Sequence, residues 1–260
     1  ARGRGLRTPL GRLQATAAAA AEPAAEGEAA GASADGRADC GAILDALRGA
    51  LLPLNTRKSA SRLPGRECRG FTLGLSLGYG KGIVAPTAAM GDWPDLVRVL
   101  CAACRRADPD FRFTSIQVNL NTKYLMHTDG IDAGPSRMIA CGDFSRGRMW
   151  LHDGAAGDWS AVDVRERWVA FDGREFHLTE EWDGPERWSL VYFSNPTWRK
   201  AGRSKKGRAC MERLVELGFP WPSKEDLFQD ALPREAERWA AAASALPPEL
   251  QEGCLPRQSR

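Results

Sequence analysis

Long apolar runs, histidine and charge of one sign are all scarce in this sequence of 260 residues. No stretch of 18 or more apolar residues occurs, so we expect no membrane-spanning helix. The net charge is only +3, which by itself does not indicate a polyanionic partner. The seven cysteines are odd in number and irregularly spaced, which argues against a disulfide framework and favours an intracellular compartment, cytoplasm or nucleus. The composition, 43% hydrophobic and 27% charged, is typical of a globular protein with a core.

The first 39 residues contain few side chains that a core could bury. Residues 15–39 are mostly Ala, Gly and Glu, so we predict that 1–39 is a disordered, low-complexity segment outside the fold. Residues 1–21 carry four arginines and no acid, and the alternative is an organelle transit peptide, although serine is absent. Residue 1 is Ala rather than Met, as expected of a fragment or a processed product.

Helical and strand-like periodicities divide the rest of the chain. Residues 41–54 and 94–107 repeat apolar side chains at helical spacing, and Asp92 is the expected N-cap of the second helix. Residues 209–222 and 232–246 are also helical in pattern. We therefore expect one domain over residues 40–220, with helices at its N-terminal end, and a helical extension over 221–260.

The period changes to two after Phe113, where the apolar side chains Ile116, Val118 and Leu120 alternate with Ser115, Gln117 and Asn119. Further strands are expected at 69–82, 137–144, 148–152, 160–164, 167–171, 176–180 and 188–194. Short strands at this spacing predict a sandwich or barrel, and hence a mainly β (α+β) fold with flanking helices.

Cys101 and Cys104 form a CxxC pattern within the second predicted helix. No second cysteine pair accompanies it, so we favour a place in the core over metal binding or redox chemistry.

Two of the three histidines belong to a pattern that suggests a metal site. His127-x-Asp129 is followed by His177 and then by Arg187-x-Ser189. Two imidazoles and one carboxylate can hold Fe(II) on one face and leave coordination positions open. Residues at i and i+2 share a strand face, so the pair can aim inward while a distant strand supplies the third ligand. An arginine on a neighbouring strand can bind a carboxylate in a two-pronged contact.

Each part of this pattern has an ordinary alternative. His-x-Asp alone fits a surface turn, and Arg187 could pair with Glu186 or Asp183 at the surface. His152 competes with His177 for the third ligand position, but it has no Arg-x-Ser at the corresponding distance. We therefore favour His177.

Residues 70–195 resemble the Fe(II)/2-oxoglutarate-dependent dioxygenases, in particular a subgroup from algae and other protists. That subgroup is loosely similar to oxygenases acting on thymine or 5-methylcytosine in DNA. The stretches that carry the resemblance are FTSIQVNLNTKYLMHTD, GPSRMIACGDFSRGRMWLHD and RERWVAFDGREFHLTEEWDGPERWSLVYFSN. The resemblance implies a double-stranded β-helix (jelly roll). One departure concerns SRGRMW (145–150), where relatives more often have a Gly-Gly-acidic run beside the substrate.

The resemblance also implies the cofactors and their residues. Fe(II) would be held by His127, Asp129 and His177, with O₂ and 2-oxoglutarate as cosubstrates. Arg187 would be the fourth catalytic residue and would bind the C5 carboxylate of 2-oxoglutarate.

Two weaker candidates for cosubstrate binding follow from the same resemblance. Ser189 would assist Arg187, and Asn119 would touch the cosubstrate.

The function implied is hydroxylation or oxidative demethylation of an unidentified primary substrate, for which a nucleic-acid base is one candidate. The basic segment 199–208 could neutralise phosphates, and its alternative is a solvated basic loop. The tryptophans of residues 150–198 could stack on a planar substrate, although most are expected in the core. We expect a monomer. The rival functions are a jelly-roll binding module without catalytic activity and a cupin-like metalloenzyme that does not use 2-oxoglutarate.

Overall fold

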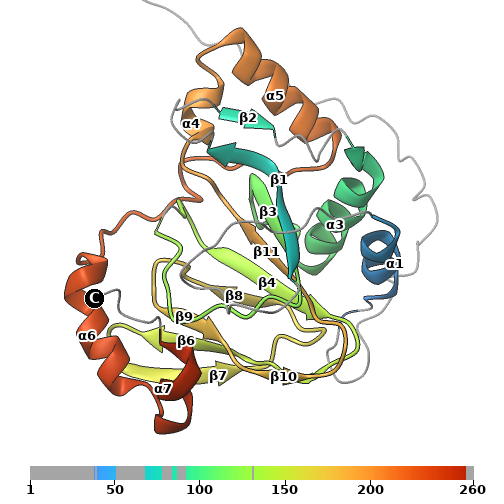
Figure 1. Cartoon of the computed structure of the whole chain (residues 1–260). Helices are drawn as coiled ribbons and strands as arrows, with labels where there is room; N and C mark the ends of the chain where they lie inside the picture. Colours follow the sequence, from blue (N-terminus) through green and yellow to red (C-terminus); the bar gives the residue numbers. More distant parts are fainter. Residues whose placement is uncertain are drawn as a thin grey trace, which may run out of the picture. The chain divides into compact units, whose positions relative to one another are not determined.

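Antiparallel strands form a six-stranded sheet, a three-stranded sheet and a two-stranded ladder in the computed structural model (Figure 1). The structure describes residues 38, 40–50, 68–77, 84–86, 92–130 and 132–255. The predictions for residues 1–37, 39, 51–54 and 78–82 lie outside these residues. The described residues belong to one compact unit, residues 32–260. None of their helices is long and apolar enough to cross a membrane.

The larger sheet is antiparallel throughout. In spatial order its strands are β2 (Val84–Pro86), β1 (Arg69–Leu77), β3 (Ser115–Leu120), β11 (Trp188–Phe193), β4 (Ser136–Cys141) and β8 (Val169–Phe171). The smaller sheet has the order β7 (Asp158–Val162), β6 (Met149–Asp153) and β9 (His177–Thr179). A short ladder joins β5 (Ser145–Arg146) to β10 (Trp182–Asp183).

The order in which the chain visits the sheets defines the fold. After β3 in the larger sheet, the segment around His127 pairs with β9 of the smaller sheet. The chain returns to the larger sheet at β4, forms β6 and β7 in the smaller sheet, and then alternates through β8, β9 and β11. This winding is that of a double-stranded β-helix, so the predicted fold class is confirmed.

Helices cover the outer face of the larger sheet. They are α1 (Gly41–Gly49), α3 (Pro94–Ala107), α4 (Trp198–Ala201) and α5 (Lys205–Glu216). The predicted alternation in β3 is confirmed, because Ile116 and Val118 are fully buried in the core beneath these helices. Burying such a side chain contributes about 1.5–3 kcal/mol. The opposite face of β3 carries Gln117 and Asn119 and borders a cavity between the two sheets.

The start of α3 differs from the expected one. Asp92 is not its N-cap: that position is taken by Trp93, without a side-chain cap, and Pro94 occupies the first helical residue. The fixed φ of proline sets this start, since its missing N–H is not needed there. Cys101 and Cys104 are both buried on this helix, as predicted for core residues.

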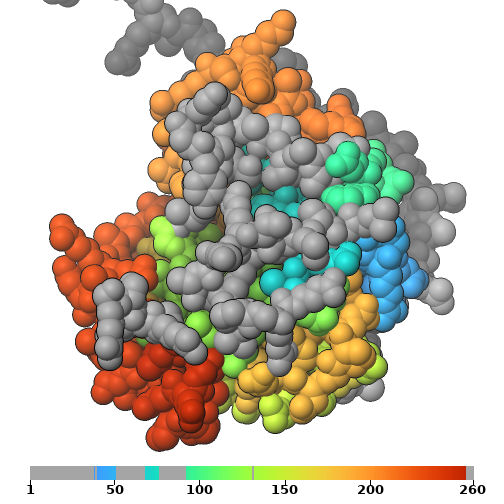
Figure 2. Space-filling view, viewed as in Figure 1, coloured from blue at the N-terminus to red at the C-terminus, as the bar shows by residue number. Residues whose placement is uncertain are grey.

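Two C-terminal helices cover the outer face of the smaller sheet. They are α6 (Glu235–Ala245) and α7 (Pro248–Cys254). Ala242 of α6 and Leu246, which directly follows this helix, pack with Phe176 and Leu178 from the strand region of β9. Figure 2 shows this segment in red beside the yellow-green strands. The layers are therefore helices, larger sheet, cavity, smaller sheet and helices.

Candidate metal centre

His127 and His177 are 50 residues apart in sequence but lie opposite each other on paired backbone segments. The His127 amide donates to the His177 carbonyl at 3.1 Å, and the His177 amide donates to the His127 carbonyl at 2.9 Å. This antiparallel pairing places both imidazoles together, with ring centroids 4.3 Å apart. Asp129 follows two residues after His127, and its amide donates to the Gly173 carbonyl at 2.6 Å.

The three side chains meet at one point. Asp129 Oδ1 lies 3.7 Å from His127 Nε2, and Asp129 Oδ2 lies 3.5 Å from His177 Nε2. One ligand atom from each residue lies within 4.8 Å of the other two. Donors that bind one ion at bonds of about 2.1 Å lie about 3 Å apart, so small side-chain shifts bring this set into range. The His177 side chain is 7% exposed and that of Asp129 is 37% exposed, so the site opens on the Asp129 side.

Backbone carbonyls fix which ring nitrogen of each histidine faces the site. His127 Nδ1 lies 2.7 Å from the Leu125 carbonyl, and His177 Nδ1 lies 2.9 Å from the Glu175 carbonyl. A carbonyl can only accept, so Nδ1 carries a proton on both rings, and Nε2 is the nitrogen left to bind a metal ion. Both Nε2 atoms face Asp129. This donor set, two imidazole nitrogens and one carboxylate, fits non-haem Fe(II).

The site's electrostatics favour a cation. Burial, together with the nearby His177, lowers the pKa of His127 to about 4, so its imidazole is neutral at pH 7. Burial also disfavours the ionised carboxylate, but the hydrogen bond and charge of His177 outweigh it and lower the pKa of Asp129. Burial also disfavours the charged form of His177, but the hydrogen bond and charge of Asp129 outweigh it and raise the pKa of His177. A divalent ion would replace the shared proton of this His177–Asp129 pair.

The cluster forms part of the wall of a cavity of about 380 Å³, which lies between the two sheets. This volume is in the range of small-molecule sites. The side chains lining it are Gln117, Asn119, Tyr124, His127, Thr128, Asp129, Asp132, Met138, Met149, Phe171, His177, Leu178, Thr179, Ser189, Val191 and Phe193. The lining combines apolar side chains, such as Met138, Met149 and Phe171, with polar ones.

Asn119 and Ser189 are paired across β3 and β11 and line this cavity together. Asn119 Oδ1 accepts from the Tyr124 hydroxyl at 2.9 Å and from Gln117 Nε2 at 3.0 Å. Two donors on the oxygen fix the orientation of the amide. Asn119 Nδ2 is buried and has no hydrogen-bond partner among the described residues. An unpaired buried donor beside a cavity indicates a place for a ligand oxygen.

Arg187 is buried rather than at the surface, with an exposed fraction of 1%. Its Nη2 donates to the Gly147 carbonyl at 3.0 Å, and its guanidinium lies 5.3 Å from the Trp182 ring centroid and 5.4 Å from that of Phe144. Its Nε has no partner among the described residues. Burial lowers the pKa of Arg187 to about 10.

The structure does not place Arg187 in the cavity lining itself. It precedes the lining residue Ser189 by two positions in the chain, and it packs against Trp182 of β10. The two acidic residues considered as its partners are used elsewhere: Glu186 binds Arg48 at 2.5 Å, and Asp183 lies 3.4 Å from Arg146. In the described part of the chain, no carboxylate forms an ion pair with Arg187.

His152 lies outside the cluster. It is buried on the outer side of the smaller sheet, where its ring packs 5.2 Å from Trp159. None of the tryptophans at residues 150–198 lines the cavity, and they pack against the core clusters instead. The aromatic lining comes from Tyr124, Phe171 and Phe193.

Tyr124, Thr179 and Asp132 are among the lining residues that were not predicted from the sequence. Tyr124 stacks on the His127 ring at 5.2 Å, and Thr179 follows His177 on β9 with the same facing. Asp132 accepts from the Ser136 hydroxyl at 2.6 Å. The sequence signal that could have identified them is their position two or three residues from His127, Asp129 or His177, because such residues share a strand or turn with these side chains.

Known proteins are similar to this chain in backbone structure but not in sequence. No family model and no curated protein matches the sequence. Solved structures that are similar include an oxidoreductase of the 2OG-Fe(II) oxygenase family from Burkholderia pseudomallei, at 18% identity over 58% of this chain and 75% of that chain, with a TM-score of 0.40. NgTET1 in complex with 5mC DNA is 15% identical over 49% of this chain and 61% of that chain, with a TM-score of 0.36. The 2-oxoglutarate complex of dioxygenase for auxin oxidation 1 from Arabidopsis thaliana is 14% identical over 58% and 74%, with a TM-score of 0.29.

Proposed function

We propose that this protein is an Fe(II)- and 2-oxoglutarate-dependent oxygenase. The observation that carries the proposal is the meeting of His127 Nε2, His177 Nε2 and the Asp129 carboxylate inside a cavity between two sheets. Three protein ligands on one side leave the cavity side of an ion open for other ligands. When bound, ferrous iron with 2-oxoglutarate would supply the oxidising chemistry, in which O₂ oxidises a substrate C–H bond and 2-oxoglutarate becomes succinate and CO₂.

The chain's own residues would hold the cosubstrate from two sides. Arg187 is a buried cation without a carboxylate partner in the described chain, and it would bind the distal carboxylate of 2-oxoglutarate. Ser189, two positions along β11, would donate its hydroxyl near the same carboxylate. Asn119 Nδ2 would donate to an oxygen of the cosubstrate and so gain the partner that it lacks.

The cavity would exclude water from the reacting atoms. Met138, Met149 and Phe171 supply apolar walls around the metal ligands. Because the site is more exposed at Asp129 than at His177, the primary substrate would approach from the Asp129 side.

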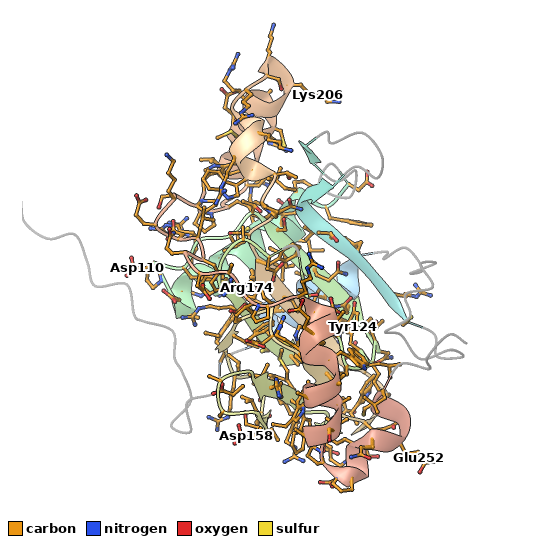
Figure 3. The ribbon with its side chains drawn as sticks, turned by 90° about the vertical axis from the view of Figure 1, so that its left-hand side faces the viewer. Asp110, Tyr124, Asp158, Arg174, Lys206 and Glu252 are labelled. Carbon is orange, nitrogen blue, oxygen red and sulfur yellow. The ribbon has the colours of Figure 1, made fainter. Side chains whose placement is uncertain are left out.

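A nucleic-acid base is our proposed primary substrate. Six cations occupy α4, α5 and the turn between them: Arg199, Lys200, Arg203, Lys205, Lys206 and Arg208. All six are exposed, and none is ion-paired within the described chain. Figure 2 shows α5 in orange at the top of this face, and in Figure 3 Lys206 projects outward at the end opposite Glu252. Phe193, which lines the cavity, is five residues before α4, so the basic helices follow directly from the strand that carries Ser189. Unpaired surface cations bind phosphates.

Succinate release tests the proposed reaction. The full-length chain with Fe(II), 2-oxoglutarate and O₂ should release succinate, and His127→Ala should abolish the release. His152→Ala is the matched control, because His152 lies outside the cluster, and it should keep wild-type turnover. A binding module without activity would release no succinate. A cupin-like metalloenzyme would bind metal and convert a substrate without 2-oxoglutarate, and Arg187→Ala would leave it unchanged.

The substrate is tested by stimulation of the same release. Oligonucleotides containing thymine or 5-methylcytosine are compared with peptides and small metabolites. We expect oligonucleotides to stimulate, and the Lys205→Glu/Lys206→Glu double variant to lose the stimulation while keeping succinate release in their absence. Arg105→Glu/Arg106→Glu is the control, since it changes two adjacent exposed arginines on α3. Stimulation by peptides or metabolites alone would contradict the nucleic-acid substrate.

A further inference from the structure

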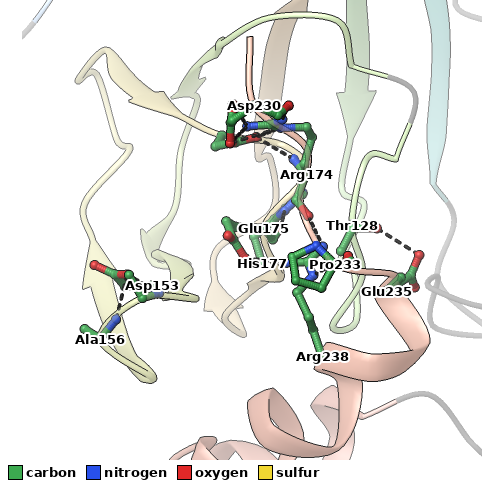
Figure 4. Close-up of polar contacts among 12 residues, drawn as sticks. Thr128, Asp153, Ala156, Arg174, Glu175, His177, Asp230, Pro233, Glu235 and Arg238 are labelled. Atoms are coloured by element: carbon green, nitrogen blue, oxygen red, sulfur yellow. Dashed lines mark hydrogen bonds and ion pairs between the residues drawn. The ribbon is translucent and has the colours of Figure 1, made fainter. Parts of the chain in front are cut away.

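Arg238 on α6 contacts the residues that immediately precede the metal ligand His177 (Figure 4). Its Nη1 donates to Glu175 Oε2 at 2.5 Å, and its Nη2 donates to the Arg174 carbonyl at 2.8 Å. Its guanidinium also lies 5.3 Å from the Phe176 ring centroid. One side chain therefore fixes three consecutive residues. The fourth residue of the run is His177.

Glu175 links this contact to the metal site. The Glu175 carbonyl lies 2.9 Å from His177 Nδ1 and so sets the direction of the imidazole. The Glu175 carboxylate and the Arg238 guanidinium are mostly buried, with exposed fractions of 21% and 16%. A partly buried, charge-assisted pair holds its geometry better than an exposed one. Arg238 thus limits the movement of the carbonyl that orients His177.

The same C-terminal segment also contacts the other ligand-bearing strand. Glu235 Oε2, at the start of α6, accepts from the Thr128 hydroxyl at 3.0 Å, and Thr128 lies between His127 and Asp129 (Figure 4). The carbonyl of Cys254 on α7 accepts from the Met126 amide at 2.8 Å. Both metal-binding segments are therefore tied from outside by α6 and α7.

We infer that α6 braces the metal centre and that Arg238 is a positioning residue for His177. This inference rests on the proposed metal site. Groups that orient the ligands of a metal tune its affinity, and their loss typically weakens binding by about 10- to 100-fold. Arg238 acts one residue further out, through Glu175, so we expect an effect of about 10-fold.

The test uses Co(II) as the probe, added without oxygen to the full-length chain, with the visible absorption of the bound ion as readout. Arg238→Ala should raise the dissociation constant about 10-fold and change the absorption bands, because the His177 imidazole is no longer held. Arg238→Lys should lie between it and the wild type, because lysine can pair with Glu175 but cannot also reach the Arg174 carbonyl in the same way. The matched control is Arg213→Ala, which removes a 3.0 Å ion pair with Glu216 on α5.

Thermal unfolding without metal separates positioning from folding. If Arg238→Ala lowers the melting temperature while the Co(II) affinity and spectrum stay at wild-type values, the inference is overturned and Arg238 is only structural. If Arg238→Ala does not fold, the lysine variant decides by the same criteria. Failure of the metal site itself is recognised separately, because the wild type and His127→Ala would then bind Co(II) equally or not at all.

Discussion

Replacing Arg187 with methionine should affect stability and ligand binding very differently. The guanidinium is 1% exposed, and its burial lowers the pKa of Arg187 from its ordinary value to about 10. This change corresponds to about 3 kcal/mol against the charged form. Arg187→Met removes that cost and keeps an apolar side chain of similar length.

The same substitution removes favourable contacts. The hydrogen bond to the Gly147 carbonyl is worth about 1.5–3 kcal/mol as a charged bond. The contacts with the rings of Phe144 and Trp182 contribute about 0.5–2 kcal/mol each. These losses together amount to about 2.5–7 kcal/mol, against a gain of about 3 kcal/mol, so the free energy of unfolding without ligand should fall by no more than about 4 kcal/mol.

Binding of 2-oxoglutarate should instead fall sharply. Losing a charge-assisted contact of about 3 kcal/mol weakens the affinity by about 100-fold. Urea denaturation gives the free energy of unfolding. Calorimetric titration of 2-oxoglutarate into Mn(II)-loaded protein gives the affinity for 2-oxoglutarate. If Arg187→Met binds 2-oxoglutarate as tightly as the wild type, the proposed role of Arg187 in binding its carboxylate is refuted. It is refuted equally if the variant loses more than about 4 kcal/mol, which would show that Arg187 has a strong partner within the fold.

Two further substitutions test the packing of the site and the docking of α1. A Cβ at Gly173 would lie 2.5 Å from Asp132 Oδ2 and 3.2 Å from Asp129 Cβ. Gly173→Ala should therefore weaken Mn(II) binding about 10-fold in a calorimetric titration. Unchanged affinity would show that the turn accommodates the methyl group without moving Asp129. The hydrogen bond from Arg48 lowers the pKa of Glu186, so its stabilisation is present above the ordinary value near 4.5 and is lost as the pH falls through the lowered value. Glu186→Gln should therefore lower the free energy of unfolding by about 1 kcal/mol at pH 7 and approach the wild type in acid, measured by urea denaturation across pH; a constant difference at every pH would contradict this.

The strands and the His127-x-Asp129 pattern could be predicted from the sequence because their signals are local. The alternation of Ile116 and Val118 with Gln117 and Asn119 follows from the pleat of a strand, and it correctly separated the core face of β3 from the cavity face. His127-x-Asp129 is likewise a pattern of two residues on one face. His177 was preferred to His152 as the third member of the cluster because Arg187-x-Ser189 follows it at the corresponding distance.

What the sequence could not show depends on contacts between distant segments. The alternative for Arg187, a surface ion pair with the adjacent Glu186, could not be dismissed from the sequence, because Glu186 binds Arg48 from a helix 138 residues away. The role of α6 was also hidden, because nothing in the sequence near Arg238 indicates that it meets Glu175. The start of α3 was misjudged at Asp92, since proline geometry at Pro94 outweighed the capping preference.

Metal stoichiometry in the histidine variants tests the central claim most directly. Anaerobic titration with Fe(II) should show one tightly bound ion per chain in the wild type and in His152→Ala. His127→Ala and His177→Ala should each lose it, because two remaining protein ligands hold the ion far more weakly. Retention of one tightly bound ion by both of these variants would contradict the account.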